Sequence, residues 1–214
     1  MLKSKIYFIA AVGTDSGKTY FVEKICCNLR QKKKSVMAIK PIVSGFRDGD
    51  KNSDPARILS ALDLEISKKN LDLISPWRFE KAISPHLAGK INFEKVKNFC
   101  LEKISLSKKQ KQFLFIEASG GVMSPLNDEK TFLDLAAELK IPLLLITGNY
   151  LGSISHTLCA IEVLKSRKIP IEKIIVNEHF SESQKPSGIQ AKQLLKTIKN
   201  FSGIEVIFLK NFLD

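Results

Sequence analysis

A short segment near the start of the chain combines the residue types that bind phosphate. Gly17, Lys18 and Thr19 follow an apolar run and open a segment with helical periodicity. The first backbone N–H groups of such a helix carry partial positive charge and attract phosphate. Gly17 allows close approach of the backbone, Lys18 adds a full positive charge, and the Thr19 hydroxyl can coordinate Mg²⁺. We interpret the segment as a nucleotide-binding loop made of Gly13, Thr14, Asp15, Ser16, Gly17, Lys18 and Thr19.

The loop departs from the standard phosphate-binding pattern at one position. That pattern has a glycine five residues before Gly17, where this chain has Val12. The nearest preceding glycine is Gly13. The alternative interpretation is an ordinary strand–turn–helix connection with a chance Gly-Lys-Thr. The flanking strand and helix patterns favour the nucleotide loop.

Charged side chains follow two other apolar runs. Lys40 follows Val36–Ile39, and Glu117 follows Phe113–Ile116. A charge at the end of a buried strand is costly unless it is paired, so Glu117 indicates a ligand site rather than a structural cap. Lys40, taken alone, would be interpreted as a surface lysine. Asp54 precedes a proline and either caps a helix or provides an oxygen ligand for Mg²⁺.

Two glycine-containing turns follow predicted strands as well. Gly120 and Gly121 allow the backbone to pass close to a ligand just beyond Glu117. The turn over residues 150–155 leads into a helix whose free N–H groups suit a carboxylate. The three histidines and four cysteines show no spacing typical of a metal site, a nucleophile set or a redox pair. The predicted chemistry is therefore phosphate and cation binding.

The segments that position these residues alternate between two patterns. Nearly continuous apolar runs indicate strands buried on both faces, as in parallel sheets covered by helices. The alternation predicts a single domain over residues 1–214 with a doubly wound α/β fold, a mainly parallel sheet and helices on both faces. Ligands bind beyond the carboxyl ends of such strands. The predicted strands are Ile6–Ala11, Val36–Ile39, Phe113–Ile116, Leu143–Thr147, Lys173–Asn177 and Glu205–Leu209, the helices are Thr19–Gln31, Asn92–Ser105, Ser155–Arg167 and Ser187–Lys199, and the long loops are Pro41–Pro55 and Leu73–Lys90.

The chain is strongly basic, with a formal net charge of +12. Lysine and arginine neutralise nucleic-acid phosphates, but here the lysines are spread over many segments. The densest run, Lys32–Lys34, lacks the interleaved aromatic residues of a single-strand platform, so we favour a solvated basic surface. No apolar stretch reaches the ~18 residues of a membrane span. The N-terminus shows no signal-peptide pattern, so we expect a cytoplasmic protein without a membrane or nucleic-acid partner.

Taken together, these motifs resemble those of the dethiobiotin synthetases. Each motif is weak alone, but their order and spacing from about Tyr7 to Glu178 are similar to that family. The resemblance implies a P-loop NTPase-like fold, ATP as co-substrate and Mg²⁺ as cofactor. It rests on the Gly-Lys-Thr loop, Lys40-Pro41, Ser44-Gly45, Asn52-Ser53-Asp54, Ser84-Pro85-His86, Glu117, Gly120-Gly121, Pro125-Leu126-Asn127-Asp128, Leu151-Gly152, His156 and Asn177.

The resemblance also implies a reaction. In this family diaminopelargonic acid, CO₂ and ATP give dethiobiotin through a carbamate and a carbamic–phosphoric anhydride. Lys18 and Lys40 would be the catalytic residues, because phosphoryl transfer needs positioning and positive charge. The Mg²⁺ ligands would be Thr19, Asp54 and Glu117.

The same resemblance implies the binding residues and the assembly. Glu117 and Asn177 would bind the nucleotide together with the loop, and the substrate would contact Lys40 and Ser44. Gly120 and Gly121 would pass close to it. Family members are homodimers with the substrate site at the interface. The neighbouring subunit's turn would receive the carboxylate of the diamine, through Tyr150, Leu151, Gly152 and Ser153.

Two departures from the family and two alternatives remain. The family has a glycine where Ala11 stands, and a Gly-x-Ile-Pro turn after its last strand, where this chain has Lys210-Asn211-Phe212-Leu213-Asp214. One alternative is a nucleotide-switch ATPase of the partitioning type that binds DNA or a protein partner. Such proteins usually carry an additional lysine early in the loop, and none lies between Ile6 and Gly17. The amidotransferase-linked relatives of the fold need a glutaminase domain, for which 214 residues leave no room.

Overall fold

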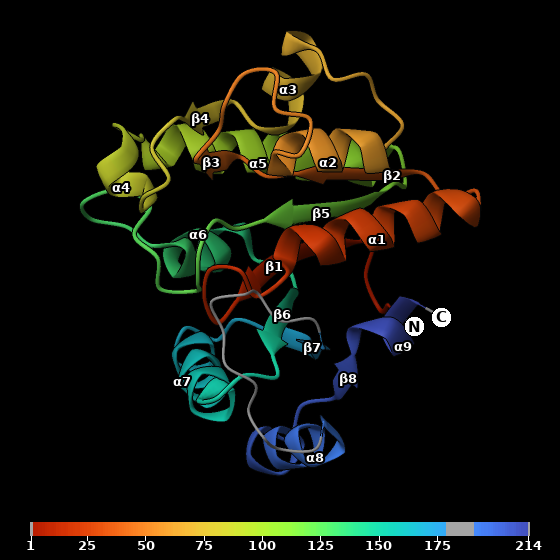
Figure 1. The fold of residues 1–214 in the computed structure, drawn as a ribbon, viewed down its shortest axis with the longest axis vertical. Helices are drawn as coiled ribbons and strands as arrows, with labels where there is room; N and C mark the ends of the chain where they lie inside the picture. The colour runs from red at the N-terminus through yellow and green to blue at the C-terminus, as the bar shows by residue number, and fades with distance from the viewer. Residues whose placement is uncertain (1, 179–190, 214) are drawn as a thin grey trace.

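The computed structural model describes residues 2–178 and 191–213. Six strands form one sheet in the order β2-β5-β1-β6-β7-β8, and every neighbouring pair is parallel (Figure 1). The doubly wound parallel sheet predicted from the apolar runs is therefore confirmed. The strands are β1 (Ile6–Ala11), β2 (Val36–Ile39), β5 (Phe113–Glu117), β6 (Leu143–Gly148), β7 (Ile171–Asn177) and β8 (Val206–Phe208).

Helices cover both faces of the sheet. The chain moves from β1 to β2 in one direction across the sheet and from β2 through β5, β6 and β7 to β8 in the other. Right-handed crossovers then place α1 on one face and α5, α6, α7 and α8 on the opposite face. The pairs α1–α2, α1–α9, α5–α6 and α7–α8 pack together. These helices are α1 (Lys18–Gln31), α2 (Asp54–Ala61), α5 (Phe93–Lys109), α6 (Phe132–Leu139), α7 (Ser153–Ser166), α8 (Ala191–Ser202) and α9 (Leu209–Leu213).

The core lies between these two helix layers and explains the apolar strands. Every residue of β1 and of β6 is buried. The register of the parallel pairs places Ile9 beside Glu117 and Gly148 beside Asn177. Because parallel strands end at the same edge, the residues that follow β1, β2, β5 and β7 gather there.

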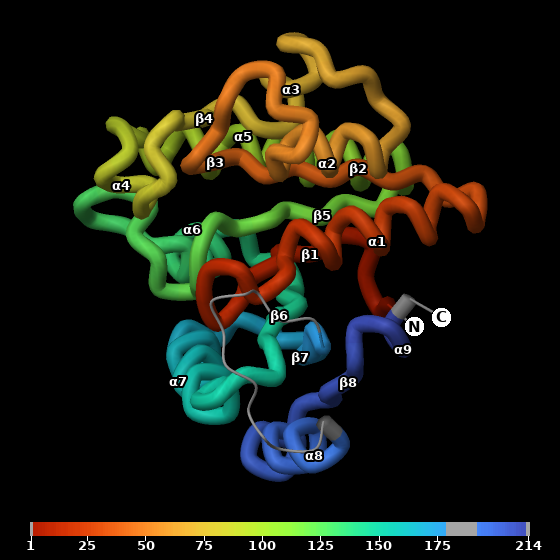
Figure 2. The backbone as a smooth tube through the Cα atoms, viewed as in Figure 1, coloured from red at the N-terminus to blue at the C-terminus, as the bar shows by residue number. Residues whose placement is uncertain are grey.

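The chain between β2 and α5 contains elements that the sequence pattern does not predict. Two short strands, β3 and β4, form a separate parallel pair. The prediction that Pro41–Pro55 and Leu73–Lys90 are long loops is wrong where these short elements form, because three-residue strands are too short to show periodicity. Figure 2 shows these segments on the same side of β5 as α2, away from α7 and α8. The added elements are β3 (Ile42–Ser44), β4 (Trp77–Phe79), α3 (Lys68–Ile74) and α4 (Pro85–Ala88).

The remaining element predictions differ from the structure mainly at their ends. The first part of the predicted helix Ser187–Lys199 lies outside the described residues. Sequence reasoning missed α6, although Thr131 and Asp134 form a capping box that marks its start. Within the described residues, no helix combines the length and apolar character that crossing a membrane requires.

Candidate active site

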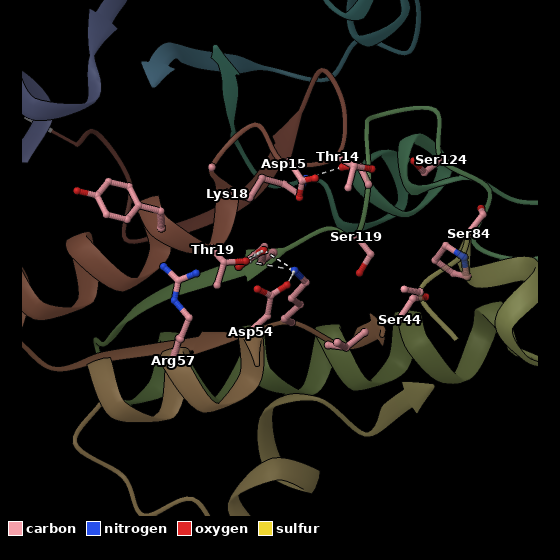
Figure 3. A pocket seen from close by; sticks show the side chains of 18 of the residues that line it. Thr14, Asp15, Lys18, Thr19, Ser44, Asp54, Arg57, Ser84, Ser119 and Ser124 are labelled. Carbon is pink, nitrogen blue, oxygen red and sulfur yellow. Dashed lines mark hydrogen bonds and ion pairs between the residues drawn. The ribbon is translucent and has the colours of Figure 1, made fainter. Parts of the chain in front are cut away.

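A cavity of 910 Å³ opens at the carboxyl edge of the sheet. Figure 3 shows side chains pointing into it from the loop after β1, from β3, from α2 and from the segment after β5. Most residues predicted to carry function line it, namely Thr14, Asp15, Gly17, Lys18, Thr19, Lys40, Ser44, Asp54, Glu117, Gly120 and Asn177. The predicted residues outside its lining are Gly13, Ser16, Gly121, Tyr150, Leu151, Gly152 and Ser153.

Gly17 is required by the geometry of the predicted nucleotide loop. It caps α1 at φ 92°, a left-handed conformation that glycine adopts without steric cost. The side chain of Asn177, at the end of β7, lies where a Cβ at Gly17 would stand. Asn177 Nδ2 also donates a hydrogen bond to the Ser16 carbonyl oxygen at 3.4 Å. Asn177 thus connects the loop to β7.

Gly13 has no comparable steric requirement. A Cβ at Gly13 would meet no described atom within 4 Å. In the part of the loop before Gly17, the residue with a left-handed conformation is Asp15, at φ 56°. The Gly13 carbonyl oxygen accepts hydrogen bonds from Ser16 Oγ at 3.0 Å and from Lys18 Nζ at 3.2 Å. Side chains, rather than a left-handed Gly13, therefore hold the first half of this variant loop.

Lys18 is held between two loops. Its Nζ donates to the carbonyl oxygens of Gly13 at 3.2 Å and of Gly120 at 2.6 Å, and the residue is 5% exposed. Burial lowers the pKa of Lys18 to about 8, and the Lys40 ammonium acts in the same direction. A phosphate group nearby favours the charged form of a lysine. The surroundings of Lys18 are therefore suited to an anion.

Lys40 lies at the centre of a buried network of charges. It directly follows β2, and its Nζ forms ion pairs with Asp54 and, at 2.8 Å, with Glu117. It also donates a hydrogen bond to Thr19 Oγ1 at 3.2 Å. Burial alone would lower the pKa of Lys40, but the two carboxylates hold it above its ordinary value. For Asp54 burial acts in the opposite direction and raises the pKa. The Lys40 ammonium outweighs this effect and holds the pKa of Asp54 below its usual range.

Glu117 offers the oxygen atoms that a divalent cation needs. It ends β5 and is 1% exposed, and its Oε1 accepts a hydrogen bond from Thr19 Oγ1 at 2.6 Å. Its Oε2 is buried and has no hydrogen-bond partner among the described residues. A buried carboxylate oxygen is costly to leave unpaired, and a cation would satisfy it.

The oxygen set around Glu117 fits Mg²⁺. Asp54, the first residue of α2, and the Thr19 hydroxyl supply further hard oxygen atoms. The N-cap of α2 is Ser53, so Asp54 does not have the helix-capping role that was the alternative to binding Mg²⁺. Among the described residues, no three or more acidic, histidine or cysteine side chains lie close enough together to hold a metal ion by themselves. Mg²⁺ commonly uses one or two carboxylates together with phosphate oxygens and water.

The residues predicted to contact the substrate divide into two groups. Ser44 ends β3, and its buried Oγ has no hydrogen-bond partner in the part of the chain that the structure describes. Gly120 has φ 72° and presents its carbonyl oxygen to Lys18. Gly121 packs against the loop after β1, where a Cβ would lie 3.0 Å from the Val12 carbonyl oxygen. Ser44 and Gly120 thus face the cavity, while Gly121 holds two loops together.

The turn after β6 does not reach the cavity of its own chain. Gly152 caps α7 at φ 94°, and Leu151 is 69% exposed. Tyr150 Oη lies 2.9 Å from His156 Nδ1. Ser153 is 1% exposed, and its Oγ is without a hydrogen-bond partner within the described residues. The predicted role of this turn in a neighbouring subunit's site stays a prediction.

Several cavity residues were not predicted as site residues. Arg57 lies three residues after Asp54 on α2, and that helical spacing would have indicated a shared face. Ser119 donates a hydrogen bond to the Ile42 carbonyl oxygen and ties the loop after β5 to β3. Its position between the predicted site residues Glu117 and Gly120 could have identified Ser119 as a cavity residue from the sequence. The other lining residues are Tyr20, Val43, Ala82, Ile83, Ser84, Pro85 and Ser124, of which Ser84 and Pro85 were noted only for the family resemblance.

Comparison with known proteins first defines the class. Residues 5–208 match a family described as an AAA domain. The MinD cell division protein of Aquifex aeolicus superposes with a TM-score of 0.54 over 98% of this chain and 86% of that chain, at 16% identity. The signal recognition particle receptor FtsY from Elizabethkingia anophelis gives a TM-score of 0.54 over 96% of this chain and 58% of that chain, at 11% identity. Identities this low show the fold alone, which is the P-loop NTPase-like α/β fold.

Curated relatives then identify the family within that class. The ATP-dependent dethiobiotin synthetase BioD of Phenylobacterium zucineum is 34% identical over 206 residues, covering 94% of this chain and 86% of the relative. The protein of the same name from Caulobacter vibrioides is 38% identical over 180 residues, covering 81% and 80%. The chain belongs to the ATP-dependent dethiobiotin synthetases, a family of ligases. The resemblance inferred from the motifs is confirmed.

Proposed function

We propose that this protein joins diaminopelargonic acid and CO₂ to give dethiobiotin, with cleavage of ATP to ADP and phosphate. The observation that carries the proposal is the shared cavity of Lys18, Thr19, Lys40, Asp54 and Glu117 at the tips of adjacent parallel strands. Two ammonium groups and two carboxylates there suit a reaction between a triphosphate, a cation and an anionic intermediate.

The proposed reaction has three steps. One amine of the diamine adds to CO₂, loses a proton and becomes a carbamate. A carbamate oxygen then attacks the γ-phosphorus of ATP, the bond to the β-phosphate oxygen breaks, and ADP leaves. The second amine finally attacks the carbamoyl carbon and loses a proton, the bond to the phosphate oxygen breaks, and a cyclic urea forms.

Residues of the loop after β1 would hold the nucleotide. In this proposal Lys18 leaves its two carbonyl partners and binds phosphate oxygens, while the first N–H groups of α1 face the same phosphates. Asn177, which already contacts Gly17, would fix the loop and take part in nucleotide binding. Phosphoryl transfer passes through a loose transition state, so such positioning and charge are the main help a protein can give.

Lys40 and Ser44 would handle the carboxylated substrate. The Lys40 ammonium would balance the negative charge of the carbamate, and the unpaired Ser44 Oγ would donate a hydrogen bond to it. Gly120 would let the backbone pass close to the reacting groups. The partly enclosed cavity would also limit attack by water on the anhydride.

Thr19, Asp54 and Glu117 would hold Mg²⁺. The ion would neutralise charge on the phosphate oxygens during transfer. Support for this set comes from the unpaired Glu117 Oε2 and from the hard oxygen atoms around it.

We further propose that residues 1–214 act as one domain and that the protein works as a cytoplasmic homodimer. The turn after β6 lies outside the cavity of its own chain, and its Leu151 is exposed. This exposed turn is therefore available to a second copy, whose substrate carboxylate it would receive.

The proposal is tested by measuring phosphate release and product formation together. Purified protein with Mg-ATP should release phosphate only when both diaminopelargonate and bicarbonate are present, and mass spectrometry should detect dethiobiotin in equal amount. Equal ATP hydrolysis without the diamine would contradict the proposed reaction.

A further inference from the structure

The Lys40 ammonium occupies the same oxygen set that is proposed to bind the divalent cation. Its Nζ contacts Thr19 Oγ1 at 3.2 Å, Glu117 Oε1 at 2.8 Å and Asp54 Oδ2. Those three side chains are the whole protein contribution to the proposed cation site.

An ammonium group and a divalent cation compete in this cluster. Lys40 already uses Thr19 Oγ1, Glu117 Oε1 and Asp54 Oδ2 and leaves only Glu117 Oε2 of the Glu117 carboxylate unpaired, and the two positive charges repel each other strongly inside a buried site. Lys40 is 6% exposed, so little solvent is present to screen that repulsion. Binding of one must therefore weaken binding of the other.

We propose that Lys40 is a displaceable occupant of the cation site, which Mg²⁺ releases so that the lysine can act on the substrate. This inference rests on the metal-binding part of the proposed function. The cation would then have two roles, because it would neutralise charge on the phosphates and would also free Lys40 to act on the substrate. The released ammonium finds new acceptors in the same cavity, among them the unpaired Ser44 Oγ.

A second buried lysine shows what a purely structural ion pair looks like. Lys173 is 5% exposed and pairs with Glu205 at 2.5 Å. The Glu205 side chain is 57% exposed, and neither residue lines the cavity. Lys173 therefore has a carboxylate partner without competition from the proposed cation, and it serves as an internal control.

The first test uses the unaltered protein. A short pulse of acetic anhydride is applied with and without saturating MgCl₂ at matched ionic strength, and acetylation of each lysine is measured by peptide mass spectrometry. Acetylation of Lys40 should rise about fivefold or more with Mg²⁺, while that of Lys173 stays unchanged. Equal acetylation of Lys40 under both conditions would overturn the proposal.

The second test measures cation binding in variants without substrate. Electron paramagnetic resonance of free Mn²⁺ gives its Kd for the wild type, Lys40→Met and the charge-matched control Lys173→Met. Lys40→Met should bind Mn²⁺ at least about tenfold more tightly, because the competitor is gone. Lys173→Met also loses one positive charge, but its lysine pairs with Glu205 outside the cavity, so the Kd should stay within about threefold of the wild type.

The outcomes of the variant test separate the possible explanations. Equal tightening in both variants would overturn the proposal, because long-range charge would then explain the result. No tightening in Lys40→Met, with circular dichroism showing an intact fold, would overturn it as well. Neither test contains the diamine, so failure to form dethiobiotin would refute the proposed reaction without changing these readouts.

Discussion

The two halves of the sheet edge differ in the groups they bring to the cavity. The loops after β1 and β2, the end of β5 and the first turn of α2 supply the charged groups that line the cavity among the described residues, namely Asp15, Lys18, Lys40, Asp54, Arg57 and Glu117. From the β6–β7 half, Asn177 lines the cavity, while the turn after β6 faces elsewhere. One half thus concentrates charge within a single chain, and the other offers neutral groups and an exposed turn.

This difference indicates a division of labour. Buried charges lose their hydration and need partners at fixed distances, so they are best placed on adjacent strands of one rigid sheet. A neutral hydroxyl or backbone group without a hydrogen-bond partner costs less free energy than an unpaired charge. Such groups can therefore remain unpaired until a ligand or another subunit binds. We expect substitutions in the charged half to affect turnover and those in the neutral half to affect stability or substrate affinity.

The largest expected effect belongs to the two cavity lysines. Lys40→Ala and Lys18→Ala should each lower dethiobiotin formation by roughly 10³-fold or more, because each removes a charge that faces the developing phosphoryl charge. The measurement is the single-turnover rate with saturating substrates. Lys173→Met removes a comparably buried lysine outside the cavity and should keep turnover within about twofold. Near-normal turnover in either alanine variant would contradict the expected difference between the charged half and the neutral half of the sheet edge.

The next effect concerns the cation requirement. Glu117→Gln should lower kcat by about 10²-fold and raise the Mg²⁺ concentration needed for half-maximal activity, because the amide is a weaker ligand than the carboxylate. A Mg²⁺ titration of the initial rate measures this. Glu205→Gln is the matched control, since Glu205 also pairs with a buried lysine but does not line the cavity. An unchanged Mg²⁺ requirement in Glu117→Gln would remove Glu117 from the proposed cation site.

A smaller effect distinguishes two glycines of the same loop by stability. Gly17→Ala should destabilise the fold by about 1–3 kcal/mol, because φ 92° is strained for alanine and Asn177 occupies the space. Gly13→Ala should change the free energy of unfolding by less than about 0.5 kcal/mol, because its Cβ meets open space. Urea unfolding of both variants gives the comparison. Equal destabilisation would show that Gly13 matters for a reason other than steric fit.

The smallest expected effect lies in the neutral half. Ser153→Ala removes a buried hydroxyl that has no partner among the described residues, so the fold should keep its stability or gain slightly. If the turn of a second subunit receives the diamine, the KM for diaminopelargonate should rise several-fold while the KM for ATP stays unchanged. Steady-state kinetics with each substrate varied in turn makes this measurement. An equal rise in both KM values would argue against a specific role in diamine binding.

Sequence reasoning placed the long elements and most of the cavity residues. Continuous apolar runs as in β1 and β6 are possible only where both faces are covered, so the parallel sheet followed from them. Parallel strands end at one edge, which brought Lys40 and Glu117 together without knowledge of distances. The method failed for β3, β4 and α4, which are too short to show a period and form through contacts with distant segments.

The sequence by itself determined which groups are available: a Gly-Lys-Thr loop after an apolar strand, charges after two further strands, and a family pattern spread along the chain. Only the tertiary structure decided how those groups pair. The ion pairs of Lys40 with Asp54 and Glu117 join segments 14 and 77 residues apart. The contact of Asn177 with the loop spans 161 residues. Local propensity carries no information about such distances, because long-range contacts form only when the packed sheet brings its strand tips together.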